Sequence, residues 1–220
     1  MVQLRSEHDR AIGRLAVPAL GTLVAEPLYV LADTAIVGHL GTSELAGLAL
    51  ASTVLLTLHA LLIFLAYGTT GAIARMIGAG RIGAAAHRST QAIWLAVALG
   101  IGVLVVLSLG GDGALRLLGG EGEALAAGRR YLSISLFGFP FMLVLLAASG
   151  SFHGRQNTKL PLAIAISGAV LNLVIELILV PGLGYGVGAS ALSTVIAQVL
   201  TGTVGAVLVL RWARSEGASP

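Results

Sequence analysis

The sequence predicts an all-α polytopic membrane protein, built as a bundle of six transmembrane helices. Two observations lead to this fold class. Of the 220 residues, 56% are hydrophobic and only 10% are charged, whereas about a quarter of a soluble domain is charged. The mean hydropathy is +0.94, and the apolar residues form repeated runs long enough to cross a bilayer of about 30 Å.

Six apolar runs follow one another along the chain. A charged leader, residues 1–10, precedes the first run, which we interpret as a retained helix because it carries acids and lacks a small-residue cleavage site. A polar tail, residues 212–220, follows the last run. The predicted spans are 11–37, 45–74, 84–108, 125–150, 160–181 and 187–211.

Prolines and glycines are consistent with these boundaries. Pro161 suits the first turn of the fifth span. Pro18, Pro27 and Pro140 fall inside spans and predict bends, which membrane helices tolerate where neighbouring groups satisfy the freed carbonyls. The chain has 30 glycines, and small residues of this kind allow helices to approach closely in a membrane.

The distribution of Lys and Arg predicts the orientation. The leader and start of the first span, the 75–88 loop, the 153–159 loop and the end of the chain hold three, three, two and two of the thirteen basic residues. The opposite side holds Arg116, Arg129 and Arg130. The positive-inside rule therefore places both termini in the cytoplasm.

Two carboxylates lie inside the first span. An acid in the middle of a membrane helix costs about 2.5–3.5 kcal/mol on insertion scales, so Glu26 and Asp33 need a reason to be there. Seven residues apart, they lie on one helical face within about 20° of each other, with Tyr29 on the same stripe. We expect this face to be wet.

The fifth and sixth spans offer oxygen ligands at a similar depth. Glu176 is the remaining intramembrane acid, and Asn172 lies one turn before it on the same face. Counted from the outer ends of their helices, Asp33, Glu176 and Thr194 reach one layer. Such a set predicts a proton or Na⁺ site in a buried cavity.

Structural readings of the same residues remain open at this stage. Asp33 could simply hydrogen-bond a neighbour near the helix end, and Asn172 with Glu176 could form an interhelical bond. Thr194 could serve helix packing, and Tyr29 could be an interfacial or core aromatic.

The sequence argues against an enzyme and against a nucleic-acid-binding protein. The absence of cysteine excludes disulfides and thiolate chemistry. The glycine runs follow no strand, the histidines have no ligand-like spacing, and no triad motif is present, so we expect neither a catalytic residue, a cofactor nor a structural metal. The basic residues sit in short loops rather than in a patch.

Four segments together carry a family resemblance. They are Ala32-Asp33-Thr34-Ala35-Ile36-Val37-Gly38-His39-Leu40-Gly41, Gly154-Arg155-Gln156-Asn157-Thr158-Lys159-Leu160-Pro161, Asn172-Leu173-Val174-Ile175-Glu176 and Gly184-Tyr185-Gly186-Val187-Gly188-Ala189-Ser190-Ala191. In this order they resemble the amino-terminal half of a MATE (multidrug and toxic compound extrusion) transporter, nearest the DinF-like branch. The resemblance covers essentially the whole chain.

The resemblance implies a cation-coupled antiporter that exports organic, often cationic, drugs or toxic metabolites across the bacterial cytoplasmic (inner) membrane. The coupling ion would be H⁺ or Na⁺. By the family pattern, Asp33 is the protonatable coupling residue, Asn172 and Glu176 join it, with a possible Na⁺ among the three, and Tyr29 and Thr194 line the substrate cavity. We also assign Glu26, which lies on the same wet face of the first span, to the residues that line the substrate cavity.

Two departures from the family pattern bear on function. The acid of the fifth helix is often Asp, and Glu176 is longer, which affects Na⁺ geometry more than protonation. Such transporters have twelve spans in two similar halves, whereas six are predicted here. We therefore expect a second six-helix half as partner, either a missing carboxy-terminal lobe or a second copy in a homodimer.

Two other functions stay open from the sequence. A lipid or polysaccharide-precursor flippase of the same superfamily would use a similar bundle, although a basic cavity would suit it better than intramembrane acids. A non-transporting membrane assembly module would need no buried acids.

Overall fold

The computed structural model of the protein describes residues 16–17, 20–21, 24, 28 and 31–217. Its secondary structure is helical, as the sequence predicts, and four helices are long and apolar enough to cross a membrane. A bent pair of helices gives a fifth crossing if it is counted as one span. The prediction of an all-α polytopic membrane fold is therefore confirmed, while most of the first predicted span lies outside the described residues.

The described helices run in an up-and-down order. Residues 31–38 are helical and lead into α2. The helices that follow are α2 (Thr42–Leu62), α3 (Phe64–Gly78), α4 (Ile82–Leu117), α5 (Gly122–Ser135), α6 (Phe139–Gly154), α7 (Lys159–Leu177), the π-helix η1 (Ile178–Gly182) and α8 (Val187–Ser215).

Two of these crossings are interrupted. α2 and α3 are separated only by Ile63 and together form one apolar stretch of 37 residues. α5 and α6 meet at an angle of 54°. Pro140 lies at the start of α6, where the missing N–H is tolerated, so the bend predicted from this proline is confirmed. Pro18 and Pro27 lie outside the described residues.

The helices extend beyond the apolar runs at several places. α4 has 36 residues and continues to Leu117, so Asp112 and Arg116 lie on a helix rather than in a loop. The predicted place of Pro161 in the first turn of its span is confirmed, since α7 begins at Lys159. At its other end, α7 widens into the π-helix η1, which contains Pro181.

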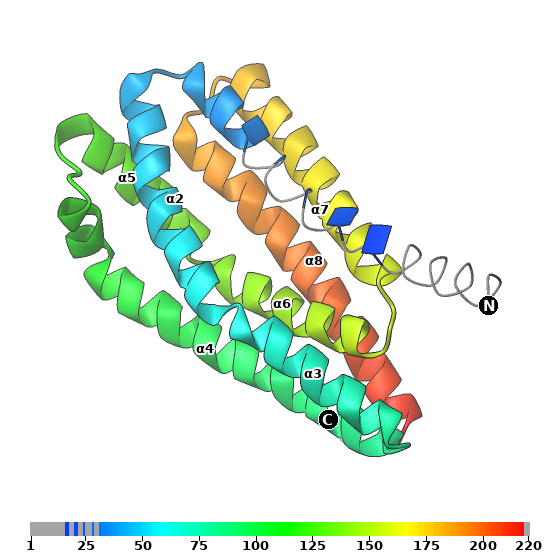
Figure 1. Ribbon diagram of the computed structural model, residues 1–220. Helices are drawn as coiled ribbons and strands as arrows, with labels where there is room; N and C mark the ends of the chain where they lie inside the picture. The colour runs from blue at the N-terminus through cyan, green and yellow to red at the C-terminus, as the bar shows by residue number, and fades with distance from the viewer. Residues whose placement is uncertain (1–15, 18–19, 22–23, 25–27, 29–30, 218–220) are drawn as a thin grey trace, which may run out of the picture.

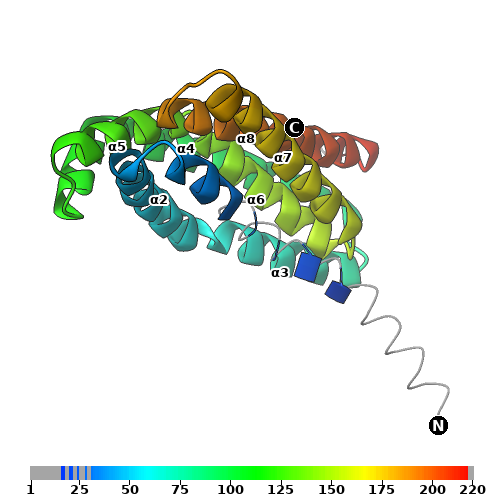
Figure 2. The same ribbon diagram turned by 90° about the horizontal axis from the view of Figure 1, so that it is seen from above.

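Helix α6 occupies the middle of the bundle (Figure 1) and packs against α3, α4, α7 and α8. α2 pairs with α5, and α7 pairs with α8. Seen from above, α7 and α8 lie together along one side, across α6 from α3 (Figure 2). Buried side chains form two clusters, one among α2, α4, α5 and α8 and one among α3, α4, α6, α7 and α8.

Glycines make the closest helix contacts, as the composition suggests. A Cβ added to Gly100 of α4 would lie 2.4 Å from the Cα of Pro140, and one added to Gly202 of α8 would lie 2.4 Å from the carbonyl oxygen of Phe141. A Cβ at Gly47 of α2 would reach within 2.6 Å of the backbone of α5. In each case the added Cβ would meet a backbone atom of the neighbouring helix, and the backbone cannot simply move aside.

A cation–π stack holds the end of α8 against the end of α6. The guanidinium carbon of Arg155 lies 5.2 Å from the ring centre of Phe152 and 4.2 Å from that of Trp212. Burial lowers the pKa of the Arg155 guanidinium from its ordinary value, and the two aromatic faces offset part of the cost of that burial. The 153–159 loop and the end of the chain are thereby joined on one side of the bundle.

The close contact at Gly100 predicts a large effect of one methyl group. Gly100→Ala should lower the melting temperature of the purified chain in detergent, because the new Cβ would overlap Pro140 and force α4 and α6 apart. Gly102→Ala is the matched control, since nothing lies within 4 Å of a Cβ at Gly102 on the same helix. It should be neutral or slightly stabilising through helix propensity. Equal melting temperatures for the two variants would contradict this packing.

Candidate functional site

Asp33 lies in a polar pocket where three helical segments meet. Its side chain is only 5% exposed. The Ser190 hydroxyl of α8 donates a hydrogen bond of 2.5 Å to Oδ1, and the Tyr131 hydroxyl of α5 lies 3.5 Å from Oδ2 as a weaker donor. These two hydroxyls supply the partners that a carboxyl group buried in a membrane requires.

Glu176 of α7 lies beside Asp33 and is fully buried. Its carboxyl group lies close enough to the carboxyl group of Asp33 for the two to interact. Within the part of the chain that the structure describes, however, neither Glu176 oxygen has a partner at hydrogen-bonding distance and angle. One carboxyl group of the pair is thus well supplied with donors, and the other is not.

Asn172 joins the same region to α8 by a second polar cluster. Its side-chain nitrogen donates to the hydroxyls of Ser193 and Thr194, both at 3.2 Å. Those two hydroxyls in turn donate to the backbone carbonyl of Ser190, at 2.7 Å and 3.2 Å. Ser190 therefore belongs to both clusters, through its hydroxyl to Asp33 and through its carbonyl to the partners of Asn172.

Helical spacing explains why these side chains converge. Asn172 and Glu176 are four residues apart and so face the same side of α7. Ser190, Ser193 and Thr194 form a matching stripe on α8, which packs against α7. Small side chains on both helices keep the two stripes in contact.

A cavity of about 270 Å³ opens next to the carboxyl pair. Asn172 and Thr194 form part of its wall, and neither Asp33 nor Glu176 does. The rest of the wall comes from α2, α6, α7 and α8 and is mainly apolar, with a few polar groups that include His59, Ser149 and Gln198. A small molecule in this cavity would reach the carboxyl pair by way of Asn172 and Thr194.

Two polar wall residues, each a single polar group in its predicted span, have weak or missing partners among the described residues. His59 Nδ1 lies 3.4 Å from the sulfur of Met142. The side-chain oxygen of Gln198 is buried and has no hydrogen-bond donor among the described residues. This oxygen lies close to Gly138, in the break between α5 and α6. A Cβ added to Gly138 would lie 2.0 Å from the oxygen.

The electrostatics of the carboxyl pair restrict its chemistry. Two carboxyl groups side by side in a poorly solvated place cannot both stay ionised unless a cation is bound beside them. Without a cation, one of the two takes up a proton. The oxygens of Glu176, which have no donor in the part of the chain that the structure describes, can accept either one. For a Na⁺ ion, the carboxyl oxygens of Asp33 and Glu176, the side-chain oxygen of Asn172 and the nearby hydroxyls form a suitable set of hard ligands.

Of the six residues predicted from the sequence, the structure describes four and brings them together: Asp33, Asn172, Glu176 and Thr194. Glu26 and Tyr29 lie outside the described residues. Sequence reasoning misses Tyr131, Ser190 and Ser193. Ser190 stands inside a segment already noted for its family resemblance, and Ser193 precedes Thr194, so both could have been found from α8. Nothing in the sequence marks Tyr131.

Comparison with known proteins identifies the family to which the chain belongs. The protein-family model described as MatE matches residues 18–178 of the chain. The chain belongs to the MATE family. The DNA damage-inducible protein F of Escherichia coli is 35% identical over 217 residues, which cover 97% of this chain and 47% of that protein. A probable multidrug resistance protein NorM of Thermotoga maritima is 27% identical over 197 residues, covering 87% and 42%.

Solved MATE structures share the fold of this chain. The crystal structure of a MATE in the bent conformation matches with a TM-score of 0.84 at 28% identity, over 90% of this chain and 44% of that one. The structure in the straight conformation matches with a TM-score of 0.83 at 29% identity, over 89% and 44%. The chain thus spans about half the length of the MATE proteins it matches.

The hydrogen bond from Ser190 predicts a specific loss of stability. Ser190→Ala should lower the stability of the chain by about 1–3 kcal/mol, because it removes a donor from the buried Asp33 carboxyl. Thermal unfolding in detergent would measure this.

Ser135→Ala is the matched control, since the Ser135 hydroxyl is also buried but has no described partner. Its removal should leave the melting temperature nearly unchanged. If both variants lost stability equally, the Ser190–Asp33 bond would not contribute as described.

Proposed function

We propose that the chain is the amino-terminal lobe of a cation-coupled antiporter that exports small organic, often cationic, compounds across the bacterial cytoplasmic membrane. The observation that carries the proposal is the buried pair Asp33 and Glu176, of which only Asp33 has hydrogen-bond donors among the described residues. Membership of the MATE family and the names of relatives as multidrug resistance proteins support it.

The pair couples export to an ion gradient by competition. When both carboxyl groups are charged, their field attracts an organic cation into the adjacent cavity. When the pair takes up H⁺ or Na⁺, that attraction is lost and the organic cation leaves. Because proton and drug favour different states of the same lobe, the downhill ion drives the uphill export.

Asn172 and Thr194 transmit the state of the pair to the cavity. Both line the cavity, and both connect to Asp33 through Ser190. A change in the charge of Asp33 alters the hydrogen bond that it accepts from the Ser190 hydroxyl. The backbone of α8 at Ser190 then shifts, and the carbonyl of Ser190 accepts the hydrogen bond from Thr194. The cavity wall is therefore sensitive to what the pair binds.

A bend in the first helix is the conformational step we propose. Similar MATE structures are titled as bent and straight conformations. In this chain the sequence has Pro27 within the first predicted span, and a proline inside a helix permits such a bend; this residue lies outside the described ones. Movement of that helix would carry Asp33 relative to Ser190 and Tyr131 and so open or close the carboxyl pair to water.

A second six-helix half completes the transporter in this proposal, because the chain covers 47% of its Escherichia coli relative. The half is either a separate lobe or a second copy of this chain. Both termini face the cytoplasm, in agreement with the count of basic residues.

The role of the carboxyl pair predicts the behaviour of two neutral variants. Asp33→Asn and Glu176→Gln should each reduce gradient-driven dye accumulation in inverted vesicles at least about tenfold, since a neutral side chain cannot exchange a coupling ion. The chain is expressed alone and with a candidate second half, first under a pH gradient and then under a Na⁺ gradient. The gradient that drives accumulation identifies the ion.

Glu121→Gln is the matched control, because it removes an exposed acid at the start of α5. The side chain of Glu121 makes no capping hydrogen bond to the helix. It should transport normally. Full coupled export by Asp33→Asn, in vesicles where the unsubstituted protein is active, would refute the assignment of Asp33.

The cavity predicts a second effect, on substrate rather than on coupling. Ala165→Phe should fill part of the cavity and raise the dye concentration needed for half-maximal transport, since Ala165 is a wall residue. Ala163→Phe, two residues away on the exposed side of α7, adds the same ring outside the cavity and should leave transport unchanged. Equal effects of both variants would place the substrate elsewhere.

A further inference from the structure

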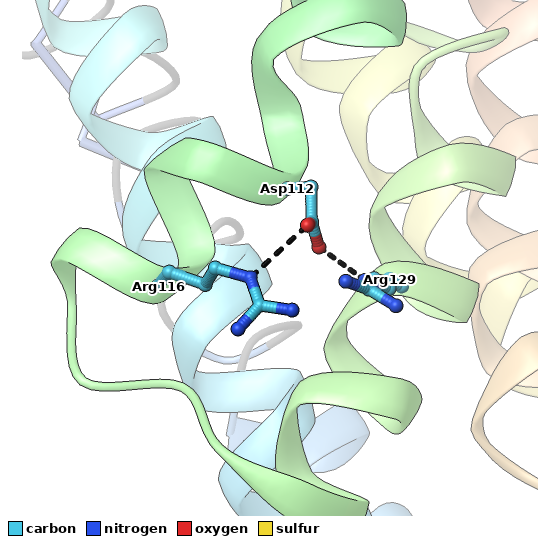
Figure 3. Close-up of polar contacts among 3 residues, drawn as sticks. All are labelled: Asp112, Arg116 and Arg129. Atoms are coloured by element: carbon cyan, nitrogen blue, oxygen red, sulfur yellow. Dashed lines mark hydrogen bonds and ion pairs between the residues drawn. The ribbon is translucent and has the colours of Figure 1, made fainter.

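A second charged cluster lies where α4 meets α5, and its Arg129 is two residues along α5 from Tyr131, which contacts Asp33. Asp112 of α4 stands between two arginines (Figure 3). One carboxylate oxygen accepts from the Nε of Arg116 at 3.1 Å, and the other accepts from the Nε of Arg129 of α5. The cluster contains two positive charges and one negative charge, so its formal net charge is +1.

The guanidinium groups keep donors available. Both use Nε for Asp112, and within the described part of the chain their terminal nitrogens have no hydrogen-bond or ion-pair partner. The side chains of Arg116 and Arg129 are 60% and 48% exposed. Each therefore presents N–H groups to a further acceptor from outside the protein.

A cavity of about 320 Å³ adjoins this cluster. Asp112 and Arg129 form its charged end. Leu107 of α4 forms the other end, together with Leu136 and Phe137 in the break after α5. These residues are five positions from Asp112 and seven or eight positions from Arg129. At 1.5 Å per residue, the groove runs about 8–12 Å from polar to apolar along the two helices.

The apolar end opens towards the surface that faces the bilayer. Phe137 is 66% exposed, and Val105, Val106 and Leu109 on the same part of α4 are 50%, 66% and 85% exposed. Large exposed apolar side chains on a membrane-spanning helix are in contact with lipid chains. The groove thus leads from the lipid-facing surface to a positively charged group at the end of the helices.

We propose that this groove is a binding site for an anionic phospholipid, with the phosphate at Arg129 and Arg116 and an acyl chain along Leu107 and Phe137. Guanidinium groups bind phosphate oxygens by charge-assisted hydrogen bonds. The net positive charge favours a lipid whose headgroup is anionic over a zwitterionic one. By the orientation proposed above, the lipid belongs to the outer leaflet.

The lipid would tie α4 to α5 beside the bend that separates α5 from α6. Leu136 and Phe137 lie within that break and also line the groove. An acyl chain seated there contacts the crossing formed by α5 and α6, which is bent by 54°. The site is independent of the proposed coupling at Asp33 and requires no transport activity to be tested.

Native mass spectrometry of the purified full chain, titrated with palmitoyl-oleoyl phosphatidylglycerol or phosphatidylcholine, tests the proposal. The chain should bind phosphatidylglycerol about tenfold more tightly than phosphatidylcholine. Arg129→Gln should abolish this preference. Leu107→Trp, which fills the apolar end but keeps all three charged residues, should weaken the binding of both lipids. Circular dichroism and size-exclusion chromatography check the fold of each variant.

Arg130→Gln is the matched control, because it removes the same charge at the neighbouring position. Arg130 does not line the groove. It should retain the preference for phosphatidylglycerol. An equal loss in Arg130→Gln and Arg129→Gln would mean diffuse attraction to positive charge and would overturn the site. Displacement of the lipid by millimolar inorganic phosphate would assign the arginines to free phosphate and would also overturn it.

Discussion

The structure depends on one constraint, which is that polar groups inside a membrane must find their partners within the protein. The carboxyl group of Asp33 meets this constraint through Ser190 and Tyr131, which come from two other helices. Each of those helices has to approach closely and in the correct register. The constraint on one carboxyl group therefore fixes the relative positions of the first helix, α5 and α8.

Close packing through glycine makes that register possible. Gly47 brings α2 onto α5, Gly100 brings α4 onto α6, and Gly202 brings α8 onto α6, each at a separation that a methyl group would prevent. Because lipid gives no hydrophobic force between helices, contact area of this kind and interhelical hydrogen bonds hold the bundle together. A cavity remains between α2, α6, α7 and α8, where several wall residues, among them Ala165, Gly168 and Ala169, are small.

Ser190 connects two polar clusters that would otherwise be separate. Its hydroxyl donates to the carboxyl group of Asp33, and its carbonyl accepts from the two hydroxyls that hold Asn172. Through this residue, the surroundings of Asp33 are linked by hydrogen bonds to Thr194, which lines the cavity. The second cavity is lined instead by Asp112 and Arg129.

The sequence by itself determined the fold class, because hydropathy and span length depend only on composition along the chain. It also determined which buried acids needed an explanation, and the four-residue spacing placed Asn172 and Glu176 on one face of α7. Only the tertiary structure decided that Tyr131 and Ser190 supply the partners of Asp33, since these contacts join residues 98 and 157 positions apart. It also decided that Glu176 lies beside Asp33 without a described donor, and that Asp112 belongs to a helix. Periodicity describes one helix at a time, whereas the rotation and depth of neighbouring helices follow from how their surfaces pack.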